Sequence, residues 1–162
     1  MKVYFDTEFT DLLGIETDIK LISAGFVTER GQELYFELTD NYEIKECSNF
    51  VHEAVLPHLD EAKYGVKIAV AAKQLKNWLQ NLGEPVQLAS DAPSYDFPLI
   101  YELLVKHDNW PESLNKKPLN VNNYSTAGRI ENYFEYQPLA IRHHALWDAR
   151  ALAAAAKGVI GD

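Results

Sequence analysis

Short apolar runs dominate the first third of the chain and recur further on. They are rich in β-branched and aromatic residues and end at glycine, proline or polar clusters, which is typical of strands. Residues 29–32 separate two of these runs and contain a glycine, so we expect a hairpin turn there. The runs predict strands at residues 2–6, 19–28, 33–38, 85–90 and 118–121.

Three later segments show the apolar spacing of helices. The first ends at Gly83, and its apolar positions are Ile68, Ala72, Leu75, Trp78, Leu79 and Leu82. Residues 95–107 predict the second helix, with Pro98 in its first turn, where proline is tolerated. The alanine-rich residues 144–157 predict the third, with Gly158 just beyond its end. Three consecutive strands followed by alternating helices and strands predict an α/β fold, a mixed β-sheet flanked by helices, in a strand order that the pattern leaves open.

The composition narrows the class of protein. The 162 residues are 47% hydrophobic and 24% charged, as in ordinary globular proteins, and show no repeat or linker, so one domain over residues 1–162 is expected. No apolar run approaches the roughly 18 residues of a membrane span, and the N-terminus lacks the layout of a signal peptide. The single cysteine, Cys47, cannot form an intramolecular disulfide. We therefore expect a cytoplasmic protein with no membrane association.

The net charge of −9 changes the picture of possible partners. Proteins that bind nucleic acid duplexes without specificity neutralise phosphates with Lys and Arg and are usually basic. An acidic chain can still act on nucleic acid if its carboxylates hold divalent cations that meet the phosphate. Such a protein should favour single-stranded ends over long duplexes.

Two carboxylates lie at the end of the first predicted strand. Because side chains alternate across a strand, Asp6 and Glu8 should project from one face while Val3 and Phe5 project from the other. Neighbouring carboxylates repel each other and are costly to desolvate unless a cation lies between them. The alternative is a solvated strand end with two unrelated acids, and the Asp-x-Glu pattern alone does not decide between them.

A third acid, Asp96, follows the predicted strand at 85–90 and a loop of small residues. It falls in the first turn of the predicted helix, where an aspartate is favoured by helix capping and by the helix dipole. Taken alone, Asp96 is therefore interpreted as a helix-capping residue.

The third segment with candidate chemistry is His143-His144-Ala145-Leu146-Trp147-Asp148-Ala149. Helical spacing places Asp148 on the apolar stripe, and a buried carboxylate needs a partner or a metal. His143 lies about 140° from Asp148 on a helical wheel, so we expect it on the preceding loop. There the helix dipole would favour the neutral imidazole that a general base needs. An ordinary pair of surface histidines is the alternative for this segment alone.

Together, the three segments resemble the DEDDh family of 3′→5′ exonucleases in order and residue type. That family has an Asp-x-Glu motif, then an Asp after a small-residue loop and an aromatic, then His-x-Ala-x-x-Asp-Ala. The matching residues here are Asp6, Glu8, Tyr95, Asp96, His143, Ala145, Asp148 and Ala149. The resemblance implies a ribonuclease H-like fold and release of nucleoside 5′-monophosphates.

The resemblance also implies a set of roles for these residues. The four carboxylates would bind two Mg²⁺ ions, with Mn²⁺ able to substitute, and all-oxygen ligands suit these hard cations. His143 maps to the general base, Glu8 counts as both catalytic and metal-binding, and His144 falls on the variable position. These roles are expectations for Asp6, Glu8, Asp96, His143 and Asp148.

The Asp6-Thr7-Glu8-Phe9 segment, the compact length and the Ser-Asp-x-x-x-Tyr-Asp loop are similar to a narrower bacterial group, the small exoribonucleases of the ribonuclease AS type. This likeness implies action on single-stranded RNA 3′ ends, with a preference for adenylate, by a homodimer. Thr7, Phe9 and Tyr95 are expected to contact substrate. Phe9 would stack on the terminal base, and packing in the core is its alternative.

Three other functions remain open. An exonuclease for single-stranded DNA ends would need the same metal site, because that site contacts phosphate and does not detect a 2′-hydroxyl. A catalytically idle nucleotide-binding module and an acidic structural subunit of a polymerase would retain the fold without hydrolysis.

Overall fold

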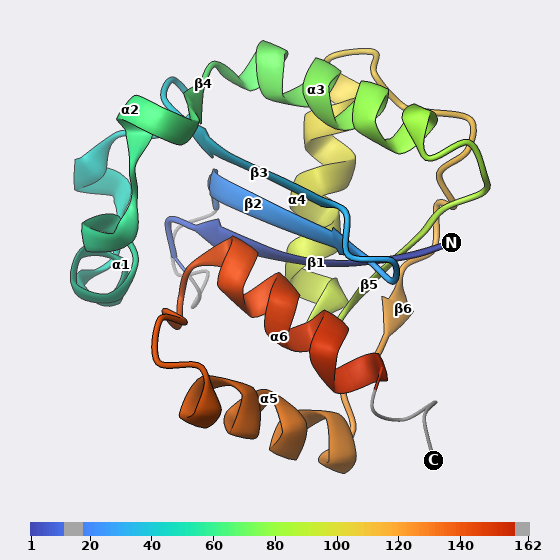
Figure 1. The fold of residues 1–162 in the computed structure, drawn as a ribbon. Helices are drawn as coiled ribbons and strands as arrows, with labels where there is room; N and C mark the ends of the chain where they lie inside the picture. The colour runs from blue at the N-terminus through green and yellow to red at the C-terminus, as the bar shows by residue number, and fades with distance from the viewer. Residues whose placement is uncertain (12–17, 158–162) are drawn as a thin grey trace.

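A computed structural model describes residues 1–11 and 18–157, and its described part contains one six-stranded sheet. The strands are β1 (Lys2–Phe9), β2 (Leu21–Thr28), β3 (Glu33–Leu38), β4 (Gly65–Val66), β5 (Gln87–Ser90) and β6 (Leu119–Asn120). They are arranged in the order β4-β3-β2-β1-β5-β6, with β1 near the centre (Figure 1). β2 pairs antiparallel with β1 and β3, whereas the β1–β5, β5–β6 and β3–β4 pairs are parallel, so the sheet is mixed.

Helices cover both faces of this sheet. They are α1 (Asn49–Ala54), α2 (Glu61–Tyr64), α3 (Ile68–Asn81), α4 (Pro93–Lys106), α5 (Tyr124–Tyr136) and α6 (Ala145–Lys157). On one face Val3 and Phe5 of β1 pack in a core with buried residues of α3 and α4. On the other face Tyr4 packs against α6, and α5 lies outside α6 (Figure 1). Within the described ranges, no helix has the length and apolar content that crossing a membrane requires.

The observed architecture confirms the predicted α/β fold, a mixed sheet flanked by helices, while some boundaries differ. β1 extends to Phe9 instead of ending at residue 6, because its pairing with β2 continues up to an irregularity after Glu8. Gly158 lies outside the described residues. α1, α2, α5 and β4 have no counterpart among the predicted elements. In α5, Thr126 is the only fully buried residue. The start of α5 is defined by Asn123, whose side chain accepts a hydrogen bond from the Thr126 N–H.

Gly25 in the middle of β2 determines how closely α6 approaches the sheet. A Cβ built on Gly25 would lie 2.5 Å from the carbonyl carbon and oxygen of Ala145 and from the Cα of Leu146. These are backbone atoms, so the first turn of α6 rests directly on the glycine. Ala145 and Ala149 are fully buried on the same side of the helix. The absence of a side chain at Gly25 therefore brings the start of α6 against β2, the neighbour of β1.

Candidate active site

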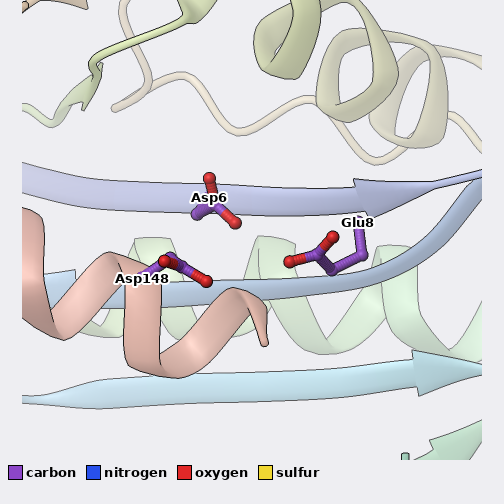
Figure 2. A group of neighbouring side chains, drawn as sticks. All are labelled: Asp6, Glu8 and Asp148. Atoms are coloured by element: carbon purple, nitrogen blue, oxygen red, sulfur yellow. The ribbon is translucent and has the colours of Figure 1, made fainter. Parts of the chain in front are cut away.

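Asp6 and Glu8 project from β1 toward α6. Tyr4 packs against α6, and the alternation of side chains along a strand places Asp6 and Glu8 on the same face. Asp148, in the first turn of α6, lies over this face. One carboxylate oxygen from each of Asp6, Glu8 and Asp148 can be chosen so that all lie within 4.8 Å of one another (Figure 2). The structure thus brings the first and third predicted segments together.

The orientation of Asp148 is supported by its own helix. The backbone N–H of His144 donates to Asp148 Oδ2 at 3.0 Å, and this N–H precedes the first turn of α6. The hydrogen bond satisfies one of the N–H groups that a helix start leaves without an intrahelical partner. It also directs the Asp148 carboxylate back toward the loop and the sheet.

Asp96 approaches the cluster from the other face of the sheet. It lies in the first turn of α4 and is buried. The Thr7 hydroxyl donates to Asp96 Oδ1 at 2.6 Å, and the Ser90 hydroxyl donates to Oδ2. Asp96 is thus held by hydroxyls of β1 and β5, and the N-cap of α4 is Ala92. These contacts do not support the helix-capping interpretation of Asp96. The Thr7 hydroxyl, which was expected to contact substrate, donates its hydrogen bond to Asp96.

Asp91 is a further carboxylate of the cluster. It belongs to the Ser-Asp-x-x-x-Tyr-Asp loop, but the sequence alone assigned it no role. Oxygens of Asp6, Asp91 and Asp96 form a second group whose members all lie within 4.8 Å of one another. Asp91 directly follows β5, which is parallel to β1. The carboxyl ends of neighbouring parallel strands lie at the same edge of a sheet. The position of Asp91 after an apolar strand was the available sequence signal, but it becomes informative only once β5 is known to lie beside β1.

Crowding and burial perturb the acidity of this cluster. Burial is the largest cause of the raised pKa of Asp6, and the nearby charges of Asp96, Asp148 and Glu8 raise this pKa further. Burial likewise raises the pKa of Glu8 to about 9 and the pKa of Asp148 to about 7. The pKa of Asp96 rises to about 6, because hydrogen bonds from hydroxyls offset part of the effect of burial. Such a cluster holds protons near neutral pH, and binding a cation would release them.

His143 lies in the turn before α6, as the helical spacing predicts. Its φ of +58° is left-handed, a conformation that is uncommon for residues other than glycine. Its ring meets the ring of Phe50 edge-on, with centroids 4.9 Å apart and planes at 84°. Burial, followed by the charges of Arg142 and His58, lowers the pKa of His143, so its imidazole is neutral at pH 7.

All of these side chains line one open cleft of about 300 Å³. Its floor is acidic, and apolar and aromatic side chains line the remainder. Phe50 and Tyr95 are both 52% exposed, so their rings are accessible from solvent at the cleft. The predicted residues that line the cleft are Asp6, Thr7, Glu8, Phe9, Tyr95, Asp96, His143 and Asp148, and Phe50, Val51, Asp91 and Ala92 join them. Phe50 lies on the short helix α1, for which the sequence shows no periodic pattern.

The donor set of the cleft fits hard divalent cations. Asp6 belongs to both sets of three neighbouring carboxylates described above. The arrangement is therefore compatible with two ions that share Asp6 as a ligand. Oxygen ligands of this kind suit Mg²⁺ and Mn²⁺, and no cysteine lines the cleft among the described residues. No lysine or arginine of the described chain lines it either. Bound cations would therefore supply an attraction for phosphate that no lysine or arginine of this lining provides.

Comparisons with solved structures agree on the fold. Pop2p of S. pombe, in a form with Mg²⁺ and Mn²⁺ bound, aligns with a TM-score of 0.57 at 16% identity, over 96% of this chain and 80% of Pop2p. Exonuclease I aligns with a TM-score of 0.60 at 12% identity, over 98% of this chain. A zinc-bound complex of E. coli exonuclease I with single-stranded DNA gives a TM-score of 0.58 at 12% identity.

The chain spans 40% of the length of exonuclease I. A scan against models of protein families and a search of curated proteins each found no match. Identities this low establish the architecture alone, and the chain accordingly has a ribonuclease H-like α/β fold, a mixed sheet flanked by helices.

Proposed function

We propose that this protein is a metal-dependent 3′→5′ exonuclease that releases nucleoside 5′-monophosphates from single-stranded nucleic acid, with RNA as its substrate. The observation that carries the proposal is the convergence of five carboxylates and a neutral histidine on one open cleft. The fold shared with exonuclease I and with Mg²⁺- and Mn²⁺-bound Pop2p supports the same class of chemistry.

The carboxylates divide naturally into two ligand groups. Asp6, Glu8 and Asp148 would hold one Mg²⁺ ion, and Asp6, Asp91 and Asp96 would hold a second, with Mn²⁺ as a substitute. When bound, such ions supply Lewis acidity, which lowers the pKa of a coordinated water and stabilises the leaving oxygen of the phosphodiester. The described part of the cleft contains no lysine or arginine, so activity should depend strictly on these ions.

His143 fits the role of general base. Its lowered pKa keeps the imidazole free to accept a proton at neutral pH. The ring lines the cleft, and no lysine or arginine of the described residues lines the same cleft. The edge contact with Phe50 restricts how the imidazole turns. Proton transfer by a positioned side chain typically contributes about 10²–10⁴-fold to a rate. His143→Ala should therefore reduce kcat by that factor while leaving Mn²⁺ affinity nearly unchanged.

The apolar side of the cleft supports a single-stranded substrate. Exposed aromatic rings such as Phe50 and Tyr95 can stack on unpaired bases, and Phe9 lines the same cleft. Two arginines elsewhere are engaged within the protein, because Arg142 pairs with Glu131 and Arg150 makes two hydrogen bonds to Glu33. The net charge of −9 likewise disfavours binding to a duplex, which usually needs a basic surface.

Single-stranded DNA is the second candidate substrate, favoured by the likeness to the exonuclease I complex with single-stranded DNA. Matched 5′-labelled RNA and DNA oligomers, incubated with Mg²⁺ or Mn²⁺, separate the two. We expect a ladder that shortens from the 3′ end of RNA, faster on adenylate homopolymers, as for ribonuclease AS-type enzymes. Faster digestion of DNA would overturn the choice of RNA.

Three controls make this experiment specific. A chelator should abolish the ladder, and Asp6→Asn, which removes the carboxylate common to both groups, should do the same in the presence of metal. His143→Ala should slow it without weakening metal binding. Full metal binding without hydrolysis of either substrate would contradict the exonuclease proposal and favour an idle nucleotide-binding module.

A homodimer is part of the same proposal. Tyr136, at the end of α5, is 74% exposed, and Leu139 just beyond it is 80% exposed. Large apolar side chains that are exposed together often mark a surface that binds another protein. Light scattering after size-exclusion chromatography should give twice the chain mass of 18.4 kDa.

A further inference from the structure

Two fully buried polar atoms lie beside the carboxylate cluster without a hydrogen-bond partner among the described residues. They are Ser23 Oγ and Glu37 Oε2, in residues that are 0% and 1% exposed. Burial raises the pKa of the Tyr35 hydroxyl, and the Ser23 hydroxyl lies near enough to lower this pKa in part, but the two do not form a hydrogen bond. Glu37 Oε2 has no such neighbour among the described residues. Buried polar atoms in folded proteins are almost always paired, with protein groups or with ordered water. A buried carboxylate with one unpaired oxygen is especially unfavourable. The two atoms therefore point to a bound partner.

The strand register places both residues in one row with Glu8. Glu8 of β1 lies opposite Ser23 of β2, and Ser23 lies opposite Glu37 of β3. Residues opposite each other on neighbouring strands project from the same face, with Cβ atoms about 4.5–5.5 Å apart. The row runs under α6, because Tyr35, two residues before Glu37, packs in the core formed with that helix. Ser23 thus lies between the Glu8 carboxylate and the Glu37 carboxylate.

Contacts on the far side hold the Glu37 carboxylate in place. Its Oε1 accepts hydrogen bonds from the Tyr35 hydroxyl and from the Asp60 N–H, both at 2.9 Å. The Tyr35 ring stacks on the His144 ring, with centroids 4.7 Å apart and planes at 24°, and the His144 N–H holds Asp148. The Glu37 carboxylate is therefore linked to Asp148 through Tyr35 and His144, and it lies in the same row as Glu8 with Ser23 between them.

We propose that Ser23 and Glu37 bind a buried water molecule and that Glu37, through this water, is a positioning residue for Glu8. This inference rests on the proposed function, since Glu8 is taken as a metal ligand. Water fits better than another cation, because Glu37 belongs to neither group of carboxylates whose oxygens lie within 4.8 Å of one another. A water with two or more polar partners is a stable part of a protein interior.

Glu37→Gln is the main test. The glutamine carbonyl can still accept from the Tyr35 hydroxyl and the Asp60 N–H, but the other position becomes an NH₂ group, which can only donate. Residues that orient metal ligands typically change metal affinity by about 10–100-fold when altered. We expect the Kd for Mn²⁺, measured by calorimetry on the folded protein, to rise by this factor. Leu38→Ala, at a buried neighbour on the opposite face of β3, is the matched control. It should lower Tm without changing the Kd for Mn²⁺.

Ser23→Ala provides a second test that does not depend on the behaviour of Glu37→Gln. If the Ser23 hydroxyl binds the water, Ser23→Ala should lower Tm and weaken Mn²⁺ binding. If the hydroxyl had no partner, its removal would raise Tm, and that result would overturn the inference. The double variant should weaken Mn²⁺ binding no more than the stronger single variant, because both act through one water.

The outcomes separate this inference from the function on which it rests. If the unaltered protein binds Mn²⁺ and both variants bind it equally well, the positioning role is wrong and the proposed function stands. If the unaltered protein binds no Mn²⁺, both proposals fail together. A high-resolution crystal structure should show the water between Ser23 Oγ and Glu37 Oε2, and a direct contact between these atoms would exclude it.

Discussion

Replacing Gly25 with alanine should separate the two halves of the proposed metal site without altering a proposed ligand. The added Cβ would lie 2.5 Å from backbone atoms of Ala145 and Leu146, whereas ordinary contacts begin near 3.4 Å. Because those atoms are backbone and cannot rotate away, α6 must move off β2 by about 1 Å. Asp148 moves with its helix, away from Asp6 and Glu8. Overpacking of this kind costs about 1–3 kcal/mol, and a misplacement of about 1 Å in an active site can cost about 10²-fold in rate.

Three quantities are measured on the Gly25→Ala protein: Tm, the Kd for Mn²⁺ and kcat. We expect Gly25→Ala to lower Tm by about 2–12 °C, from about 2–4 °C per kcal/mol for a chain of this size. Its Kd for Mn²⁺ should rise, and kcat on labelled RNA should fall by about 10²-fold. Gly128→Ala in α5 is the control, since nothing lies within 4 Å of its Cβ and alanine favours a helix by about 1 kcal/mol. A Gly25→Ala protein with the Tm and turnover of the unaltered chain would refute the role assigned to this close approach.

Two further predictions concern the acidic cluster and the base. Burial raises the pKa of Asp148 from 3.8 to about 7, so the folded metal-free protein binds more protons than the unfolded chain between these values. The stability contributed by this group is therefore lost as pH rises toward 7. Urea unfolding with a chelator present should show a steeper loss over this range than in Asp148→Asn, and equal slopes would contradict the shift. Phe50→Ala removes the edge contact with His143, and the usual worth of aromatic pairs, about 0.5–1.5 kcal/mol, predicts a 2–10-fold lower kcat. The same loss predicts that the Tm of the Phe50→Ala protein falls by only about 1–6 °C. An unaltered kcat would show that His143 is oriented by other contacts.

Local pattern was enough to predict several features of the site. The alternation of side chains along a strand placed Asp6 and Glu8 on one face, and the structure places them there, facing α6. Helical spacing placed Asp148 inward and His143 on the preceding turn, as observed. These predictions hold because they depend only on backbone geometry within a single element.

Other residues acquire their meaning only from contacts between elements. Glu37 is a charged residue in a strand, and charged side chains are usually exposed to solvent. It is buried here because its face of the strand lies beneath α6. Phe50 belongs to a short helix with no periodic pattern, and it reaches His143 across more than ninety residues of sequence. Thr7 points away from Asp6 and Glu8, and its bond to Asp96 depends on how α4 follows β5.

The sequence by itself determined the longer strands and helices of the sheet, the α/β class and the candidate ligands of a metal site, since these follow from periodicity and residue type. The strand order, the inclusion of Asp91, and the approach of α6 at Gly25 were decided only by the tertiary structure. The physical reason is that strand pairing and helix packing depend on surfaces distant in sequence, which no local pattern specifies. Five carboxylates meet in this protein because β1 and β5 run toward the same edge of one sheet and α4 and α6 begin there.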